Sequence, residues 1–223
     1  MRLMQKLLSP LCLALLIPFT AAHAADGDRV AELKKEIKTI ALANIDRTDN
    51  FPAVRSQLQP LVDELISLAP AKLEADKLAL VAGGWRNLWA DQGFGPGTDA
   101  KQVYQAVSAD GYYYNISLTK TPVGEFTNFL RGAYTDGGNL LNIEFTANSI
   151  RKDFFPAGTP VLALAQDFEA GKITALPIPG PIGVKGTLVN AYVDQDFRIV
   201  TGNSKINAAT NLFLLERADV IGE

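Results

Sequence analysis

Residues 112–119 read YYYNISLT, and the order of these side chains decides the fold. Two sets of side chains alternate along the stretch, one apolar or aromatic and the other mostly polar: Tyr112, Tyr114, Ile116 and Leu118 against Tyr113, Asn115, Ser117 and Thr119. A period of two is typical of a β-strand that buries one face and exposes the other. The same alternation returns at residues 141–146, LNIEFT. The sequence therefore predicts half-exposed strands in this part of the chain.

Turn signals separate the strand-like runs. They lie at residues 109–111, 136–139 and 156–158, close enough together for an antiparallel meander. The runs begin near Trp85, Gln102, Tyr112, Phe126, Leu140, Val161, Ile173, Thr187, Phe197 and Leu212. Roughly eight to ten strands are enough for a closed barrel that holds one small ligand. We therefore expect a mainly β protein with an antiparallel β-barrel over residues 83–223.

The chain before Gly84 has the spacing of amphipathic helices. Apolar residues recur three and four positions apart over residues 26–46 and 52–68, and a shorter helical stretch covers residues 73–81. Asn50 precedes the second helix in a capping position, and Pro60 is expected to kink or divide that helix. We expect residues 25–82 to form helices that pack on the barrel.

The first 24 residues have the order of a secretory signal peptide. Arg2 and Lys6 precede an apolar run over residues 7–19, and small residues follow at 22–24. The apolar run is shorter than the roughly 20 residues that a membrane-spanning helix needs. We expect this segment to be removed, and the mature protein to be periplasmic or secreted.

Loss of residues 1–24 would remove whole classes of chemistry. The segment holds all the Cys, His and Met residues of the chain, which are Cys12, His23, Met1 and Met4. Without them a Ser-His-Asp triad, a thiol nucleophile, a disulfide and the usual His/Cys zinc sites are excluded. Loss of Arg2 and Lys6 lowers the formal net charge from −3 to −5, which argues against a nucleic-acid partner.

Residues 190–203, NAYVDQDFRIVTGN, place Asp194, Asp196 and Arg198 in an otherwise strand-like run. We interpret the run as a hairpin, with strands at 188–193 and 197–201 and a turn at 194–196, because aspartate readily satisfies turn backbone. Asp-x-Asp alone supplies too few oxygen ligands for calcium or magnesium, so no metal site is predicted. Arg198 is expected to close the barrel end by pairing with one of the two aspartates; pairing with a ligand carboxylate or phosphate is the alternative.

Two motifs resemble those of the plastid lipid-associated proteins, or fibrillins. Residues 191–199, AYVDQDFRI, with Gly202 and the apolar run at 212–215, are similar to the C-terminal signature of that family. Residues 83–89, GGWRNLW, resemble its opening G-x-W-x-L-x-Y strand, although Trp89 replaces the tyrosine and Thr201 stands where a basic residue is common. The resemblance implies a lipocalin-like barrel, association with lipid or isoprenoid, and no established catalysis.

These observations predict a non-enzymatic carrier of a small hydrophobic molecule, with no cofactor and no catalytic residue. The predicted ligand-binding residues are Trp85, Trp89, Tyr112, Tyr114, Phe126, Phe145, Tyr192 and Arg198. Inward positions are expected for Trp85, Tyr112 or its neighbour, Phe126, Phe145 and Tyr192, which either line a cavity or fill the barrel.

Two other functions are alternatives to the carrier. A protein that coats lipid or membrane surfaces would use the N-terminal helices and the loop at residues 176–186, LPIPGPIGVKG, as a peripheral contact. A carboxylate-dependent hydrolase, using a pair such as Asp194 and Asp196, ranks third.

Overall fold

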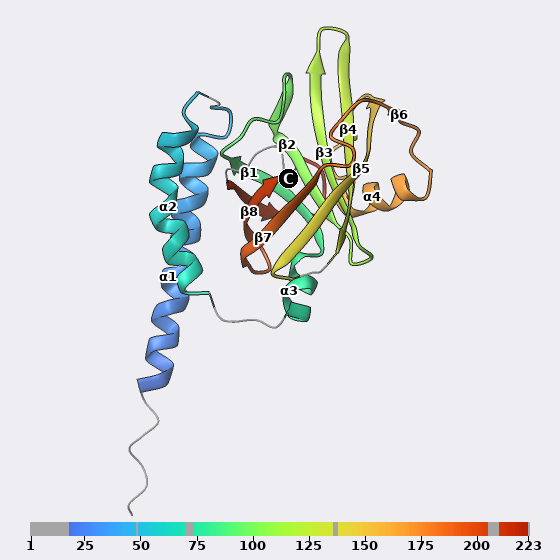
Figure 1. The fold of residues 1–223 in the computed structure, drawn as a ribbon. Helices are drawn as coiled ribbons and strands as arrows, with labels where there is room; N and C mark the ends of the chain where they lie inside the picture. Colours follow the sequence, from blue (N-terminus) through green and yellow to red (C-terminus); the bar gives the residue numbers. More distant parts are fainter. Residues whose placement is uncertain (1–17, 48, 70–73, 136–137, 205–209, 223) are drawn as a thin grey trace, which may run out of the picture.

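Within the part of the chain that the structure describes, three helices precede the strands and a fourth lies between the strands Leu140–Lys152 and Leu176–Pro177, as Figure 1 shows. The computed structural model describes residues 18–47, 49–69, 74–135, 138–204 and 210–222, with side chains from residue 27 onward except at 74–76 and 204. The helices are α1 (Pro18–Ala43), α2 (Phe51–Ser67), α3 (Glu74–Val81) and α4 (Val161–Glu169). The strands are β1 (Gly83–Ala90), β2 (Thr98–Val107), β3 (Tyr112–Thr121), β4 (Gly124–Thr135), β5 (Leu140–Lys152), β6 (Leu176–Pro177), β7 (Lys185–Val193), β8 (Phe197–Ser204) and β9 (Asn211–Arg217).

The strands form a closed antiparallel barrel. Within the described residues, eight strands pair in the order β4-β3-β2-β1-β9-β8-β7-β5, and pairing of β4 with β5 closes the circle. The two-residue strand β6 pairs with Ser149 and Ile150 of β5 and is not part of the circle. The prediction of a mainly β, lipocalin-like barrel preceded by helices is confirmed.

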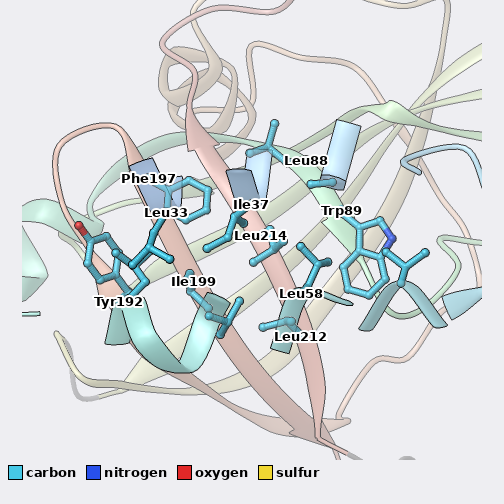
Figure 2. Close-up of a cluster of buried hydrophobic side chains, with 14 residues drawn as sticks. Leu33, Ile37, Leu58, Leu88, Trp89, Tyr192, Phe197, Ile199, Leu212 and Leu214 are labelled. Carbon is cyan, nitrogen blue, oxygen red and sulfur yellow. The ribbon is translucent and has the colours of Figure 1, made fainter. Parts of the chain in front are cut away.

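Helices α1 and α2 cover one outer face of the barrel. They lie side by side, and their apolar stripes pack against outward side chains of β1, β7, β8 and β9 (Figures 1 and 2). The cluster includes Leu33, Ile37 and Leu58 from the helices and Trp89, Tyr192, Phe197, Ile199, Leu212 and Leu214 from the strands. All of these side chains are buried, so the helix stripes are used for packing within the molecule.

Helix α4 covers a second outer face. Its Val161, Leu164 and Ala165 pack on outward side chains of β2, β3 and β4, among them Tyr104, Tyr114 and Phe129. The sequence analysis placed a strand near Val161, and that prediction is wrong. A short apolar run has no decisive period, and in the folded chain its buried residues are three and four positions apart, as in a helix.

Helix α3 closes one end of the barrel. The interior layer next to α3 includes Trp85, and it packs against Leu78, Leu80 and Val81 of the helix. Arg217 of β9 donates to the carbonyls of Leu80 and Ala82 at the end of this helix and to that of Gln195 in the β7–β8 turn. Helix and turn are thereby held together at the closed end.

Two further local predictions are corrected by the structure. Helix α2 is continuous through Pro60, so the predicted division of this helix is wrong, and Asn50 makes no capping hydrogen bond through its side chain. The strand expected near Ile173 is reduced to Leu176–Pro177, because the following Pro and Gly residues cannot supply a regular ladder of hydrogen bonds.

Candidate functional site

A cavity of about 460 Å³ lies inside the barrel, toward the end opposite α3. Side chains of β2, β3, β4, β5, β7, β8 and β9 contribute to its wall. Its apolar part includes Val103, Leu130, Ile143, Phe145, Leu188 and Phe213. The volume lies within the range of pockets that hold small molecules, roughly 300 to 1,000 Å³. The barrel is therefore not completely filled by its own side chains.

The wall of the cavity also carries many uncharged polar groups. The amide and hydroxyl side chains on it include Gln105, Asn115, Ser117, Asn128, Asn148 and Asn211. No Asp, Glu, Lys or Arg is present among the described residues that line the cavity. A wall of this kind suits a molecule with an apolar body and a few hydrogen-bonding groups.

Loops contribute the rim at the open end. Gly93 and Phe94 come from the loop between β1 and β2, and Ile178 comes from the loop that follows β6. The glycine-rich segment at 93–97 is thus a loop after the first strand. The loop at 176–186 reaches the rim of the cavity through Ile178.

Gln105 and Tyr113 form the deep end of the cavity. Both side chains are buried, and the Tyr113 hydroxyl donates to Asn115 Oδ1 at 2.8 Å. Burial raises the pKa of Tyr113 to about 12, against the opposing influence of the Arg198 charge and of the Asn115 hydrogen bond. Tyr113 is therefore a neutral hydrogen-bonding group at ordinary pH.

Arg198 lies beside these two residues and is fully buried. Its Nε donates to Asn190 Oδ1 at 2.7 Å and its Nη1 to Gln105 Oε1 at 3.3 Å, while Nη2 has no partner among the described residues. The guanidinium carbon is 5.7 Å from the centre of the Trp85 ring. Burial lowers the pKa of Arg198 to about 10, and the nearby Arg217 charge acts in the same direction.

The expected pairing of Arg198 with Asp194 or Asp196 is wrong. Arg198 points into the barrel, and none of the ion pairs among the described residues includes it. The physical reason is the strand period: Arg198 shares the inner face of β8 with Val200, whereas the two aspartates lie in the turn before the strand.

The two aspartates have a structural role. The turn at 194–196 forms as predicted, and Asp194 Oδ1 accepts hydrogen bonds from the backbone N–H groups of Asp196 and Phe197. Lys34 of α1 forms ion pairs with both carboxylates, and Lys38 lies 3.9 Å from Asp196. Helix α1 is thus tied to the closed end of the barrel by its lysines.

The eight predicted site residues separate into three groups. Phe145 lines the cavity, and Trp85 and Arg198 lie in the interior beside its deep end. Trp89 and Tyr192 face α1 and α2, and Tyr112 and Tyr114 face the α4 side. Phe126 is half-buried at the start of β4, outside the cavity wall.

The inward assignment is therefore right for Trp85 and Phe145 and wrong for Tyr192. For Tyr112 the stated alternative, its neighbour Tyr113, is the inward residue. The error has one cause: outer faces that are covered by helices are as apolar as an interior. Gln105, Asn115 and Asn128 alternate with the apolar residues of the same strands. Assigning this other face of each strand to the interior would have identified them.

Comparisons of the chain with protein-family models, curated proteins and solved structures gave no match. The resemblance to the fibrillins stays a prediction. No helix within the described residues is long and apolar enough to cross a membrane. The described residues also include no group of three His, Cys, Asp or Glu side chains placed to hold a metal ion.

Proposed function

We propose that this protein binds and carries one small amphipathic molecule, mainly apolar, inside its barrel, without catalysis. The observation that carries the proposal is the cavity of about 460 Å³ with an uncharged wall of apolar and amide side chains. Fully charged walls would favour ions or polar metabolites, whereas this wall favours a molecule that is transferred out of water by its apolar body.

The proposal is tested by filling the cavity. Leu130→Trp adds an indole to the cavity wall, and Val123→Trp adds the same group at the exposed β3–β4 turn as a control. We expect a fluorescent apolar probe to bind the full chain and the control with equal affinity and to bind Leu130→Trp at least about tenfold more weakly, about 1.4 kcal/mol. Equal binding to all three proteins would contradict the proposed site.

We further propose that residues 1–24 direct export and that the carrier works in the periplasm or outside the cell. The basic, apolar and small-residue order of this segment supports the proposal. Residues 1–17 lie outside the described residues. N-terminal sequencing of protein recovered from the periplasmic and extracellular fractions tests it, with Ala25 expected as the new first residue.

A coat on lipid surfaces is the second candidate function. Leu176 and Ile182, which are 69% and 55% exposed, favour it because they place apolar side chains on the loop at the rim of the cavity. The helices offer less, because their apolar stripes are buried against the barrel. Co-sedimentation with phosphatidylcholine vesicles separates the two functions, since a carrier stays in the supernatant and a coat protein sediments.

A further inference from the structure

We propose that the molecule carried in the barrel has a carboxylate head, and that Arg198 binds this head at the deep end of the cavity. This inference rests on the proposed carrier function and specifies its ligand class as a long-chain monocarboxylate. Arg198 would be the residue that orients the ligand, with its apolar chain directed toward the rim.

Arg198 lacks a counter-charge among the described residues. Arg198 is fully buried, its two hydrogen bonds go to neutral amides, and Nη2 has no partner among the described residues. A buried cation without an anionic partner is costly, and buried charges in proteins are ordinarily paired. A ligand carboxylate supplies the missing charge and the missing acceptor together.

The charged groups at the closed end of the barrel determine the electrostatic potential at Arg198. Arg217 lies 3.8 Å from the centre of the Trp85 ring, to which Arg198 also lies close. Three N–H groups of Arg217 donate to backbone carbonyls, and the nearby Asp194 carboxylate forms an ion pair with Lys34. Asp219 also lies near Arg217, but the charged group that acts on Arg198 is Arg217, so the potential at Arg198 favours an anion.

A ligand in the cavity reaches Arg198 past Gln105. Gln105 lies on the cavity wall and its Oε1 accepts from Arg198 Nη1 over a long 3.3 Å. Rotation of this one amide would free Nη1, and a carboxylate that reaches Nη1 and the unpartnered Nη2 can accept from both in a fork, as guanidinium groups prefer. Tyr113 lies on the same wall, and its hydroxyl already donates to Asn115, so the donors offered to the ligand head are those of Arg198. The neutral acceptor Gln105 thus marks the place of the ligand head.

The test compares two ligands with the same apolar chain. Palmitate and 1-hexadecanol are titrated into the full chain at pH 7.5, and the dissociation constants are measured by displacement of a fluorescent apolar probe. A hydrogen bond to a charged group contributes more than one between neutral groups, so we expect palmitate to bind roughly tenfold to a hundredfold more tightly.

Two variants assign the preference to Arg198. Arg198→Met keeps the length of the side chain and removes the charge, and Arg151→Met, where the guanidinium lies over Phe155 outside the cavity wall, is the matched control. Gln105→Glu gives Arg198 a carboxylate from the protein itself, and it is used if Arg198→Met does not fold. We expect Arg198→Met and Gln105→Glu each to lose the preference for palmitate, and Arg151→Met to keep it.

The outcomes distinguish the two proposals. Equal affinity of the wild-type protein for both ligands would overturn the carboxylate assignment and leave the carrier function intact. Binding of neither palmitate nor hexadecanol nor the probe would overturn the carrier function itself. A preference for palmitate that persists in both Arg198→Met and Gln105→Glu would show that another group binds the acid.

Discussion

Asp194 joins three parts of the molecule through one carboxyl group. Its Oδ1 accepts two backbone hydrogen bonds within the β7–β8 turn, and its Oδ2 accepts from the Tyr192 hydroxyl at 2.6 Å and from Lys34 of α1 at 2.8 Å. Burial raises the pKa of the carboxyl, but the Lys34 and Tyr192 hydrogen bonds lower it by more. The pKa of Asp194 therefore lies well below its usual range.

This pKa predicts how stability depends on pH. A carboxyl whose pKa is lower in the folded state stabilises the protein above its unfolded pKa, near 4, and the contribution is lost as the pH falls below that value. We expect Asp194→Asn, which keeps an acceptor for the turn, to reduce the free energy of unfolding by about 1–3 kcal/mol at pH 7. The difference from wild type should shrink below about pH 4, as measured by urea unfolding.

Asp167→Asn is the control for this measurement. Asp167 lies on α4 and pairs only with the exposed Lys172 among the described residues, and exposed ion pairs contribute little. We expect this variant to follow the wild-type curve at every pH. A destabilisation by Asp194→Asn that stayed constant down to pH 2 would contradict the role assigned to the ionised carboxyl.

Pro60 is a local defect within an otherwise regular element. Helix α2 continues through it, although proline offers no N–H to the Ser56 carbonyl and its ring crowds that turn. The apolar stripe explains why the helix persists, because Val54, Leu58, Val62 and Leu65 are all buried against α1 and the barrel. Tertiary packing thus outweighs the local preference, which the sequence pattern alone did not show.

The element-scale prediction follows from this defect. Pro60 is exposed, so Pro60→Ala restores a helical hydrogen bond without disturbing the packing. We expect the free energy of unfolding to rise by about 1–3 kcal/mol, the helix gain being reduced by the greater freedom of the unfolded chain. Thermal unfolding followed by circular dichroism measures it, with the exposed Gln57→Ala as a control that should change little. A lower melting temperature for Pro60→Ala would contradict this account.

The positions of the helices and strands were largely predictable from the sequence. Which face of each strand points into the barrel was not. The periods of two and of three to four located the hairpin at 188–201, the helices before Gly84 and most of the barrel strands. The period of β3 also showed two distinct faces, but Tyr114 and Ile116 are apolar because α4 covers them from outside. Because the sequence pattern predicts a strand where α4 forms, it does not distinguish a helix-covered outer face from an interior.

The site was predictable only in part for the same reason. Phe145 lines the cavity as expected, but Gln105 and Asn115 were passed over because amides indicate an exposed face in most strands. The inward position of Arg198 depends on where β8 begins after the turn, and a shift of one residue reverses it. Sequence parity fixes such a position only when the turn is placed correctly.

At the scale of the whole molecule, the strands are shared between interior and exterior clusters. Trp85 lies in the interior layer beside α3, whereas Trp89 on the same strand lies between the barrel and the helix pair. Because β1 contributes to both clusters, we expect the two clusters to be lost together, with the helix pair and the barrel unfolding as one cooperative unit.

Single-tryptophan variants test this cooperativity. Trp85→Phe leaves Trp89 as the reporter of the helix–barrel contact, and Trp89→Phe leaves Trp85 as the reporter of the interior. We expect each variant to give the same urea midpoint by tryptophan fluorescence and by circular dichroism at 222 nm, because a two-state unit unfolds together. An earlier fluorescence transition for the variant that retains Trp89 would mean that α1 and α2 detach first.

Strand β8 also limits how the chain can change in length during evolution. Phe197 and Ile199 face the helix pair, and Arg198 between them faces the barrel interior. An insertion or deletion of one residue at this point would exchange the two faces and press a cation against α1. The loops at the open rim, such as residues 91–97, carry no such constraint. Descendants of this chain should therefore diversify in loop length around the mouth while the register of β8 stays fixed.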